Sequence, residues 1–563
     1  MNRNGALQRF LIAAIPAAIF LCATLMNLRL PGIQYDEVYY VPPAAALLKN
    51  QLDADYVMLD PSVIHLFGKP LPLMFNYYTS FFRTYLTLPV FALFGIGVET
   101  IRGSSIALGV GALIFFIAFA RRLTKNSAIA FAAGLMFALD ASFVAYVRND
   151  FAVVATMMAL KGVVLWALLR WWQEGEAKYL YLGVFFTGLG ITDRASFLWI
   201  PMAIIATLIL IYRKNLVDEI RRRLDSTKKI FLSCVSLGIG ASIFLAFNVA
   251  TRGGTFTPMA GNFGETSGGT NNFAFLENFY LRLQMLADVL GGGYFNHFIA
   301  GEKAYQTTAW NFSGSPLSWL VPLAFVYFFI KMIAEGLYKF ARSGAPKANQ
   351  KPLLFILIMT FVLLALSCFT PTLHRGHQLL MLYPLPHLLV AMFVFDAIKL
   401  FAQKVKTLNA AAVNFIVLVF ILLICAASAR QVFTYHAMIK ETGGRGAWSD
   451  AIYQIVEEVD RHPERAVVCM DWGFNANILS LTKNPVKTIR NYYPDTRRTP
   501  EKLSELFDGT HTFLFHASEY SLMPGPRGDF ARAVALSGAR VDTLRLFYQR
   551  DGRLLALLVR ALH

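Results

Sequence analysis

Two adjacent carboxylates, Asp36 and Glu37, stand between Tyr35 and Tyr39 directly after the first long apolar run of the sequence. Charge next to hydrocarbon is costly, so a membrane protein rarely places such a pair there without a use. The pair could act as a general base with a helper carboxylate, or could bind a divalent metal ion. The alternative is a local role, in which Asp36 caps a helix that starts near Val38 and Glu37 interacts with the helix dipole.

A second suggestive stretch contains His65 and Lys69, with Pro70 and Pro72 directly after the lysine. Proline fixes the backbone, so this stretch would present Lys69 and His65 rigidly, and both could face a phosphate. The alternative is a loop stiffened by proline with a solvated lysine.

Two charged corners fall at the ends of apolar runs. Arg148 and Asp150 form the first corner, and Asp193 and Arg194 form the second. Both corners could contribute to the same site as Asp36. The alternative for Asp150 is a cap on the following helix, and the alternative for Asp193 and Arg194 is a self-compensating pair in an interfacial turn.

Three potential cations, His374, Arg375 and His377, occur within four residues. Such a cluster could hold a phosphate or another anionic headgroup. Binding of ordinary anionic membrane lipid at the interface is an equally good interpretation.

The scaffold that would position these groups is a membrane protein. Of the 563 residues, 56% are hydrophobic and only 15% are charged, against about 25% charged in soluble domains. The net charge of +17 comes from basic residues in short loops, which is typical of topology signals and excludes a nucleic-acid-binding stripe. The five cysteines show no disulfide framework or zinc spacing.

Eleven apolar runs predict membrane spans, the first of them a retained signal anchor. They cover residues 10–28, 101–119, 128–147, 151–169, 179–191, 197–211, 230–250, 316–337, 352–369, 379–400 and 411–429. With a cytoplasmic amino terminus, every strongly basic loop (residues 121–125, 213–229, 339–351 and 399–406) lies in the cytoplasm, as the positive-inside rule requires.

The same topology places loops 29–100 and 251–315 and residues 440–563 outside, in the periplasm of a bacterial inner membrane. Within the first loop, residues 38–50 predict an amphipathic helix. Residues 75–94 predict a membrane-surface helix, because Pro89 interrupts this segment and Arg83 lies inside it.

Residues 440–563 are more charged and alternate between helix and strand patterns, which predicts a small α/β domain after a transmembrane domain of residues 1–439. Amphipathic or capped helices are expected near residues 448–461, 499–507 and 529–536. Strands are expected near residues 465–470, 511–516, 541–548 and 553–559, the last two joined by Asp551 and Gly552 in a hairpin. The domain carries no phosphate-binding glycine loop.

All five groups of candidate residues therefore lie on one outer face. A reaction that removes a proton from an acceptor hydroxyl and releases a lipid-borne phosphate needs this combination of a carboxylate and cations. Two rival functions remain, a transporter or flippase of lipid-linked sugars and a membrane-anchored binding protein that works through its tail. The first predicts ionisable residues or broken helices near mid-membrane, and the second leaves Asp36 and Glu37 unexplained.

The order of these motifs resembles the C-type (GT-C) glycosyltransferases that use polyprenyl-phosphate sugars, in particular the protein O-mannosyltransferase and lipid A aminoarabinose transferase families. The matching pieces are Tyr35-Asp36-Glu37, Lys69-Pro70-Leu71-Pro72-Leu73, Gly97-Val98-Glu99-Thr100-Ile101-Arg102, Arg148-Asn149-Asp150, Asp193-Arg194, and His374-Arg375-Gly376-His377 with Tyr383-Pro384. The likeness covers about the first 200 residues well and the rest by layout.

The resemblance implies a GT-C fold and an inverting sugar transfer from a polyprenyl phosphate to a lipid, glycan or protein acceptor. It implies that Asp36 is the general base, that Asp150 supports it, and that Lys69 contacts the donor phosphate. Arg148, Arg194, His374, Arg375 and His377 would contribute to neutralising that phosphate. Gly68 stands where the aminoarabinose branch has an acidic residue that can help bind a metal, so metal dependence stays open. The sugar could be a hexose, a pentose or a uronic acid.

Overall fold

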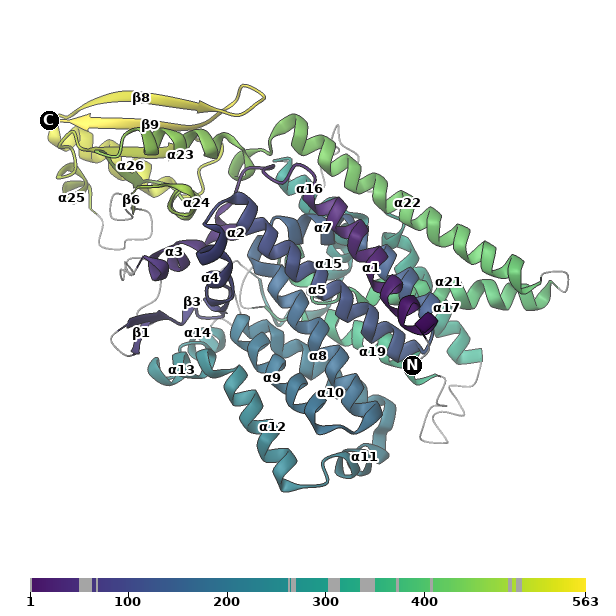
Figure 1. Ribbon diagram of the computed structural model, residues 1–563. Coiled ribbons are helices and arrows are strands. Elements are labelled where there is room, and N and C mark those ends of the chain that lie inside the picture. Colours follow the sequence, from purple (N-terminus) through teal and green to yellow (C-terminus); the bar gives the residue numbers. More distant parts are fainter. Residues whose placement is uncertain are drawn as a thin grey trace.

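A bundle of long apolar helices makes up most of the structure, and a small α/β domain packs against one end of it (Figure 1). The computed structural model describes residues 3–49, 63–66, 69–261, 264, 270–301, 314–334, 350–370, 374–405, 409–484, 489–492 and 499–563. Parts of both predicted outer loops, including residues 50–62 and 302–313, lie outside the described residues. The fold class predicted from the sequence, a mainly α polytopic membrane protein with a small α/β domain, is confirmed.

Six helices of the described chain are each long and apolar enough to cross a membrane. Four of them are α5 (Val98–Thr124), α17 (Leu317–Ala334), α21 (Leu385–Lys404) and α22 (Ala410–Thr442). The other two are α8 (Val154–Glu174) and α10 (Trp199–Tyr212), each counted together with the short 3-10 turn that precedes it. Two bent pairs also qualify, α6 (Ser127–Ala138) with α7 (Ala141–Arg148) at 59° and α12 (Thr227–Gly240) with α13 (Ser242–Ala250) at 70°. The remaining three predicted runs coincide with α1 (Arg3–Leu25), α9 (Ala177–Asp193) and α19 (Lys351–Leu366). The number of spans stays a prediction.

Each bend lies at a residue with a specific local contact. Asp140 lies between α6 and α7, where its carboxylate accepts from the backbone N–H of Phe143 at 2.7 Å and so caps α7. The α12 bend follows Gly240, where a Cβ atom would lie only 2.2 Å from the carbonyl oxygen of Phe185 in α9. Glycine therefore lets α12 pack closely on α9.

The first outer loop folds into short elements that lie beside the α/β domain (Figure 1). They are α2 (Tyr35–Val38), α3 (Val41–Leu48), the hairpin β1 (Val63–Leu66) with β2 (Lys69–Pro72), the hairpin β3 (Met74–Asn76) with β4 (Thr79–Ser80), and α4 (Phe82–Phe94). The predicted start of the second helix at residue 75 is wrong, because the Asn76 carboxamide accepts from the backbone N–H of Tyr78 and Thr79 and forms a turn. At 13 residues, α4 is about 20 Å long and too short to span, as expected for a surface helix.

The second outer loop contributes α14 (Phe256–Gly261), α15 (Phe275–Gly291) and α16 (Gly293–Ile299). Two further short helices connect spans: α11 (Leu216–Arg223) follows α10, and α20 (Gly376–Leu379) precedes α21.

The α/β domain contains one five-stranded sheet in the order β6-β5-β7-β9-β8. Its strands are β5 (Ala466–Cys469), β6 (Ile489–Asn491), β7 (His511–His516), β8 (Arg540–Tyr548) and β9 (Leu554–Leu562). The first three run parallel, and β9 pairs antiparallel with both β7 and β8. The helices are α23 (Ala451–Arg461), α24 (Asn475–Leu481), α25 (Pro500–Ser504) and α26 (Pro524–Ser537). Every helix and strand predicted for this region is present, whereas α24 and β6 were not predicted.

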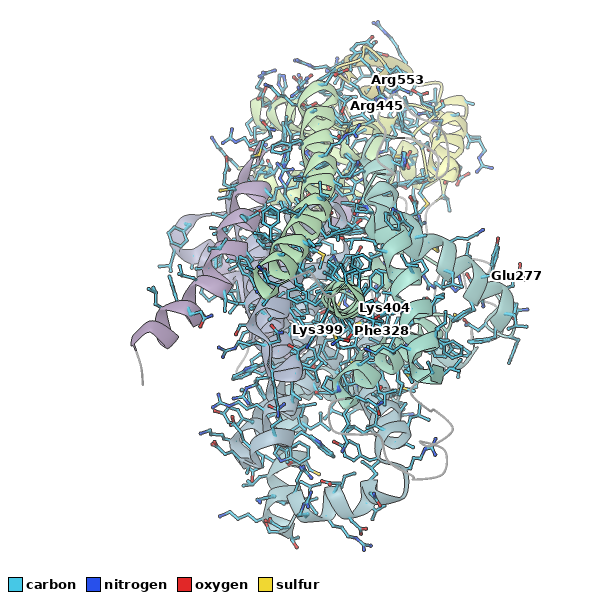
Figure 2. All side chains as sticks on the ribbon, turned by 90° about the vertical axis from the view of Figure 1, so that its right-hand side faces the viewer. Glu277, Phe328, Lys399, Lys404, Arg445 and Arg553 are labelled. Atoms are coloured by element: carbon cyan, nitrogen blue, oxygen red, sulfur yellow. The ribbon has the colours of Figure 1, made fainter. Side chains whose placement is uncertain are left out.

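The α/β domain packs directly on the loop that carries Asp36. Tyr35 contacts Trp472 with ring centroids 4.9 Å apart, and the side-chain amide of Asn477 donates to the carbonyl of Ile33 at 2.8 Å. A second attachment is Arg445, whose backbone N–H donates to the carbonyl of Ile299 in α16 at 3.0 Å. Asp551 pairs with both Arg445 and Arg553, which lie close together in Figure 2. The domain is thus fixed at two places and helps to hold α2.

Candidate active site

Asp36 lies on α2 with its carboxylate partly accessible. Gln34 caps this helix, since its side-chain oxygen accepts from the backbone N–H of Asp36 at 2.6 Å and the Glu37 carboxylate accepts from the Gln34 N–H at 3.3 Å. The interpretation of Asp36 as the cap is therefore wrong. Within the described part of the chain no side chain hydrogen-bonds to the Asp36 carboxylate. Burial raises the pKa of Asp36 to about 6, and the positive charge of Arg375 opposes the shift.

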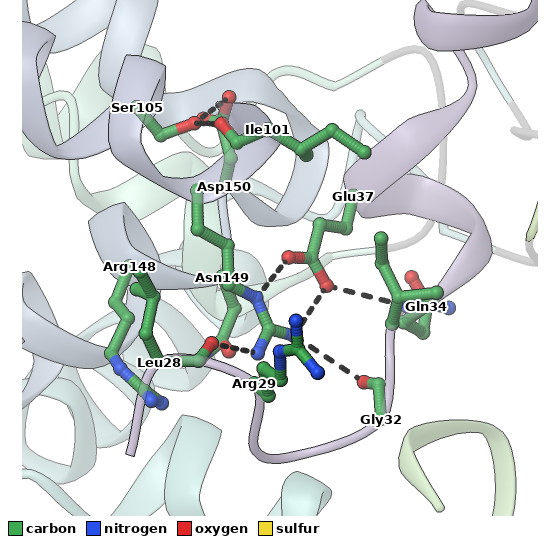
Figure 3. A network of polar contacts seen from close by, with 12 residues as sticks. Leu28, Arg29, Gly32, Gln34, Glu37, Ile101, Ser105, Arg148, Asn149 and Asp150 are labelled. Atoms are coloured by element: carbon green, nitrogen blue, oxygen red, sulfur yellow. Dashed lines mark hydrogen bonds and ion pairs between the residues drawn. The ribbon is translucent and has the colours of Figure 1, made fainter. Parts of the chain in front are cut away.

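Glu37 is fully buried and belongs to an ion pair. Its two carboxylate oxygens accept from Arg102 of α5 at 2.6 and 3.0 Å, and Arg102 also donates to the carbonyl of Leu28 at 2.7 Å. Figure 3 shows these bonds as dashed lines that end at Glu37 and Leu28. Burial raises the pKa of Glu37, and the Arg102 charge opposes the rise. Because Arg102 occupies both oxygens, Glu37 does not fit as a metal ligand beside Asp36; it anchors α2 to α5.

The described residues offer no other obvious metal site. No three His, Cys, Asp or Glu side chains among them lie close enough together to hold a metal ion. The divalent metal left open by the sequence therefore has no ligand set in this part of the chain, and no step of the chemistry is assigned to it.

Asp150 is also buried and paired. It accepts from the Ser105 hydroxyl at 2.8 Å (Figure 3) and from the N–H of Ala155 at 3.1 Å, and it lies 3.1 Å from the guanidinium of Arg83. Its backbone adopts φ +39°, a left-handed conformation that it shares with Ala152 at +55° and Val153 at +48°. Non-glycine residues adopt this conformation only where the surroundings impose it. The Asp150 contacts thus hold a strained corner directly beneath α2.

The second predicted corner supports the first. Arg194 donates to the carbonyls of Ala152 and Val153 and pairs with Asp193 at 3.0 Å. The Arg194 charge also lowers the pKa of His377, so the corner lies close to the turn that contains Arg375. The structure therefore brings together three stretches that the sequence placed on one face.

Arg148 has a different environment from the one expected. Its guanidinium is fully buried and donates to backbone carbonyls at the end of α1, including those of Thr24 at 2.9 Å and Met26 at 2.8 Å, and to the hydroxyl of Tyr435 at 2.9 Å. These contacts use the guanidinium donors to tie α1 to α7 and α22. We therefore leave Arg148 out of the proposed phosphate site.

The segment from His374 to His377, at the start of α20, keeps one cation rather than three. Burial and nearby arginines lower the pKa of His374 to about 4 and that of His377 to about 3, so both rings are neutral at pH 7. Arg375 is exposed and stays charged. The fully buried Arg282 of α15 holds this turn, donating to the carbonyls of Ser367 at 2.9 Å and Arg375 at 3.3 Å.

The other candidate residues from the sequence differ in how far they are buried. Tyr39 stacks on Phe75 with ring centroids 4.2 Å apart, and its buried hydroxyl finds no hydrogen-bond partner among the described residues. Tyr35 faces Trp472, and His65 is exposed on β1. The Lys69 backbone belongs to β2, but its side chain and the neighbouring Gly68 lie outside the described residues, so its phosphate contact stays a prediction.

Sequence reasoning assigned no site role to three residues that build this site, Arg83, Arg102 and Arg282. All three are fully buried arginines in otherwise apolar or amphipathic helices. A charge in such a position was the available signal, because it needs a buried partner. The partners themselves are far away in the sequence and could not be read from spacing.

Residues 79–239 match the family model described as dolichyl-phosphate-mannose-protein mannosyltransferase. Among solved structures, ArnT from Cupriavidus metallidurans bound to undecaprenyl phosphate is similar at 13% identity and a TM-score of 0.54, covering 99% of this chain and 98% of that chain. The apo form of the same protein gives 13% identity and a TM-score of 0.55, with 97% of each chain covered. No curated protein matches the sequence. At this identity, the similarity to ArnT shows a shared fold.

Proposed function

Because the chain belongs to the GT-C glycosyltransferases, membrane enzymes that take their sugar from a polyprenyl phosphate, we propose that it transfers such a sugar to an envelope acceptor with Asp36 as the general base. The acceptor oxygen attacks the anomeric carbon and its proton moves to Asp36. The bond between the anomeric carbon and the phosphate oxygen breaks, so the polyprenyl phosphate leaves and the anomeric configuration inverts.

The observation that carries this proposal is the environment of the Asp36 carboxylate. Among the carboxylates around α2, Glu37, Asp150 and Asp193 are each occupied by an arginine, whereas Asp36 is partly accessible. Its pKa of about 6 leaves it ionised at pH 7 and closer to that pH than an ordinary aspartate. A general base is most effective when its pKa lies near the working pH.

Cations near Asp36 would stabilise the departing phosphate. Arg375 is exposed, and its charge acts on Asp36, so a phosphate between them would meet one fixed positive charge. Arg194 lies deeper and shares its charge with Asp193. Lys69 on the β1–β2 hairpin is the third candidate. Undecaprenyl phosphate, the lipid bound by ArnT, represents the class of carrier expected here.

The acceptor and the sidedness belong to the same proposal. The acceptor group is a hydroxyl or phosphate of lipid A, another glycan or a protein, and the sugar is a hexose, a pentose or a uronic acid. The positive-inside pattern supports an amino terminus in the cytoplasm of a bacterial inner membrane and an Asp36 site and α/β domain in the periplasm.

Replacement of Asp36 by asparagine tests the proposal. Asp36→Asn keeps the size of the side chain and removes the base, so transfer from a polyprenyl-phosphate donor should fall by at least about a hundredfold. The assay compares envelope lipids and proteins by mass spectrometry in a deletion strain that expresses each variant at equal membrane abundance. Glu99→Gln is the matched control, because it removes an exposed carboxylate at the start of α5. Unchanged transfer by Asp36→Asn would exclude Asp36 as the base.

A further inference from the structure

A cavity lies at the ends of α5, α8, α10 and α19 that are remote from the Asp36 site. It has a volume of about 340 Å³, within the range of small-molecule pockets. Four helices supply its apolar wall, with Leu123 from α5, Leu168 from α8, Leu208 from α10 and Phe355 from α19. Arg102, which binds Glu37, and Leu123 are separated by about 30 Å along α5 at 1.5 Å per residue, so the cavity lies near the opposite membrane surface.

Cationic and aromatic groups line this cavity together. Lys125, at the end of α5, and Lys351, at the start of α19, both contribute to the lining. The Lys351 ammonium lies 4.3 Å from the centroid of the Tyr212 ring, and the Tyr212 hydroxyl accepts from the Trp172 indole at 3.0 Å. Neither lysine forms an ion pair with any residue that the structure describes. Two cations beside an apolar cavity are complementary to a lipid with an anionic headgroup.

We propose that this cavity binds one anionic phospholipid of the adjacent leaflet, with an acyl chain between α5, α8, α10 and α19 and its phosphate at Lys125 and Lys351. The positive-inside pattern assigns this side to the cytoplasm, where anionic phospholipids bind basic pockets between transmembrane helices. The site is separate from the Asp36 site and does not depend on the activity proposed for it.

Native mass spectrometry of the full-length protein tests the proposal with phosphatidylglycerol and phosphatidylcholine as probes. We expect one phosphatidylglycerol per chain to remain bound under conditions that remove phosphatidylcholine. Lys125→Gln with Lys351→Gln should weaken phosphatidylglycerol binding by about tenfold or more, because two charged contacts are lost. The control is Lys399→Gln with Lys404→Gln, two exposed lysines on α21 that Figure 2 labels. Neither of them lines the cavity.

A cavity-filling variant provides a second test that keeps both lysines. Leu208→Trp should displace the phosphatidylglycerol, because the larger ring occupies the space of the acyl chain. Equal retention of phosphatidylglycerol and phosphatidylcholine, or undiminished phosphatidylglycerol binding in either the lysine or the Leu208 variant, would overturn the proposal. Displacement of phosphatidylglycerol by an equimolar amount of undecaprenyl phosphate would overturn the assignment of a phospholipid as the occupant.

Discussion

The ionisable groups around α2 form two layers that differ in how their charges are used. In the inner layer, Glu37 pairs with Arg102 and Asp150 pairs with Arg83, and all four side chains are at most 1% exposed. In the outer layer, Asp36 and Arg375 are accessible and make no direct ion pair with each other. Paired buried charges fix the positions of elements, whereas an accessible and partly desolvated carboxylate is available for chemistry. Adjacent residues in one helix therefore have different roles.

The inner layer should show its role in stability. Arg102→Met leaves the Glu37 carboxylate buried without a positive charge beside it, which should destabilise the protein by about 3–5 kcal/mol. Thermal unfolding of the purified protein in detergent measures the effect. Combining Arg102→Met with Glu37→Gln should recover part of the loss, because the unpaired charge is removed. Equal stability of Arg102→Met and the wild type would contradict an anchoring role for the pair.

The outer layer should show its role in catalysis and in its pH dependence. Arg375→Gln removes the charge that opposes the rise in the pKa of Asp36, so the acid limb of the pH–rate profile should move to higher pH. The KM for the polyprenyl-phosphate donor should also rise, by roughly tenfold for one lost charged contact. Initial rates at several donor concentrations between pH 5 and pH 8 separate the two effects. A profile that keeps its midpoint would place Arg375 outside the site.

The histidines beside Arg375 should have the smallest effect. His377 is neutral at pH 7 because burial and Arg194 lower its pKa to about 3, so it adds no charge to the site. His377→Gln keeps a polar side chain and should leave the KM for the donor unchanged across this pH range. A large rise in KM would show that His377 contacts the phosphate directly.

The span positions and the secondary structure of the α/β domain were largely predictable because hydropathy and alternation are local patterns. The sequence also placed Asp36, Arg194 and Arg375 on one face through topology alone. It could not pair Glu37 with Arg102, since the two residues lie 65 positions apart and meet only in the folded chain. The charge states of His374 and His377 were equally out of reach, because they depend on burial in the folded chain and on the charge of Arg282, which is distant in the sequence.

The pH dependence of kcat/KM for sugar transfer tests the central claim, that ionised Asp36 is the base, most directly. Its pKa of about 6 predicts a plateau above pH 7 and, below pH 6, a fall of about tenfold per pH unit as the carboxylate becomes protonated. The thermal unfolding midpoint of the purified protein should be measured at each pH beside the rate. A fall in rate that is caused by loss of folded protein is then recognised. A rate that stays constant from pH 8 down to pH 5 while the protein remains folded would contradict the claim.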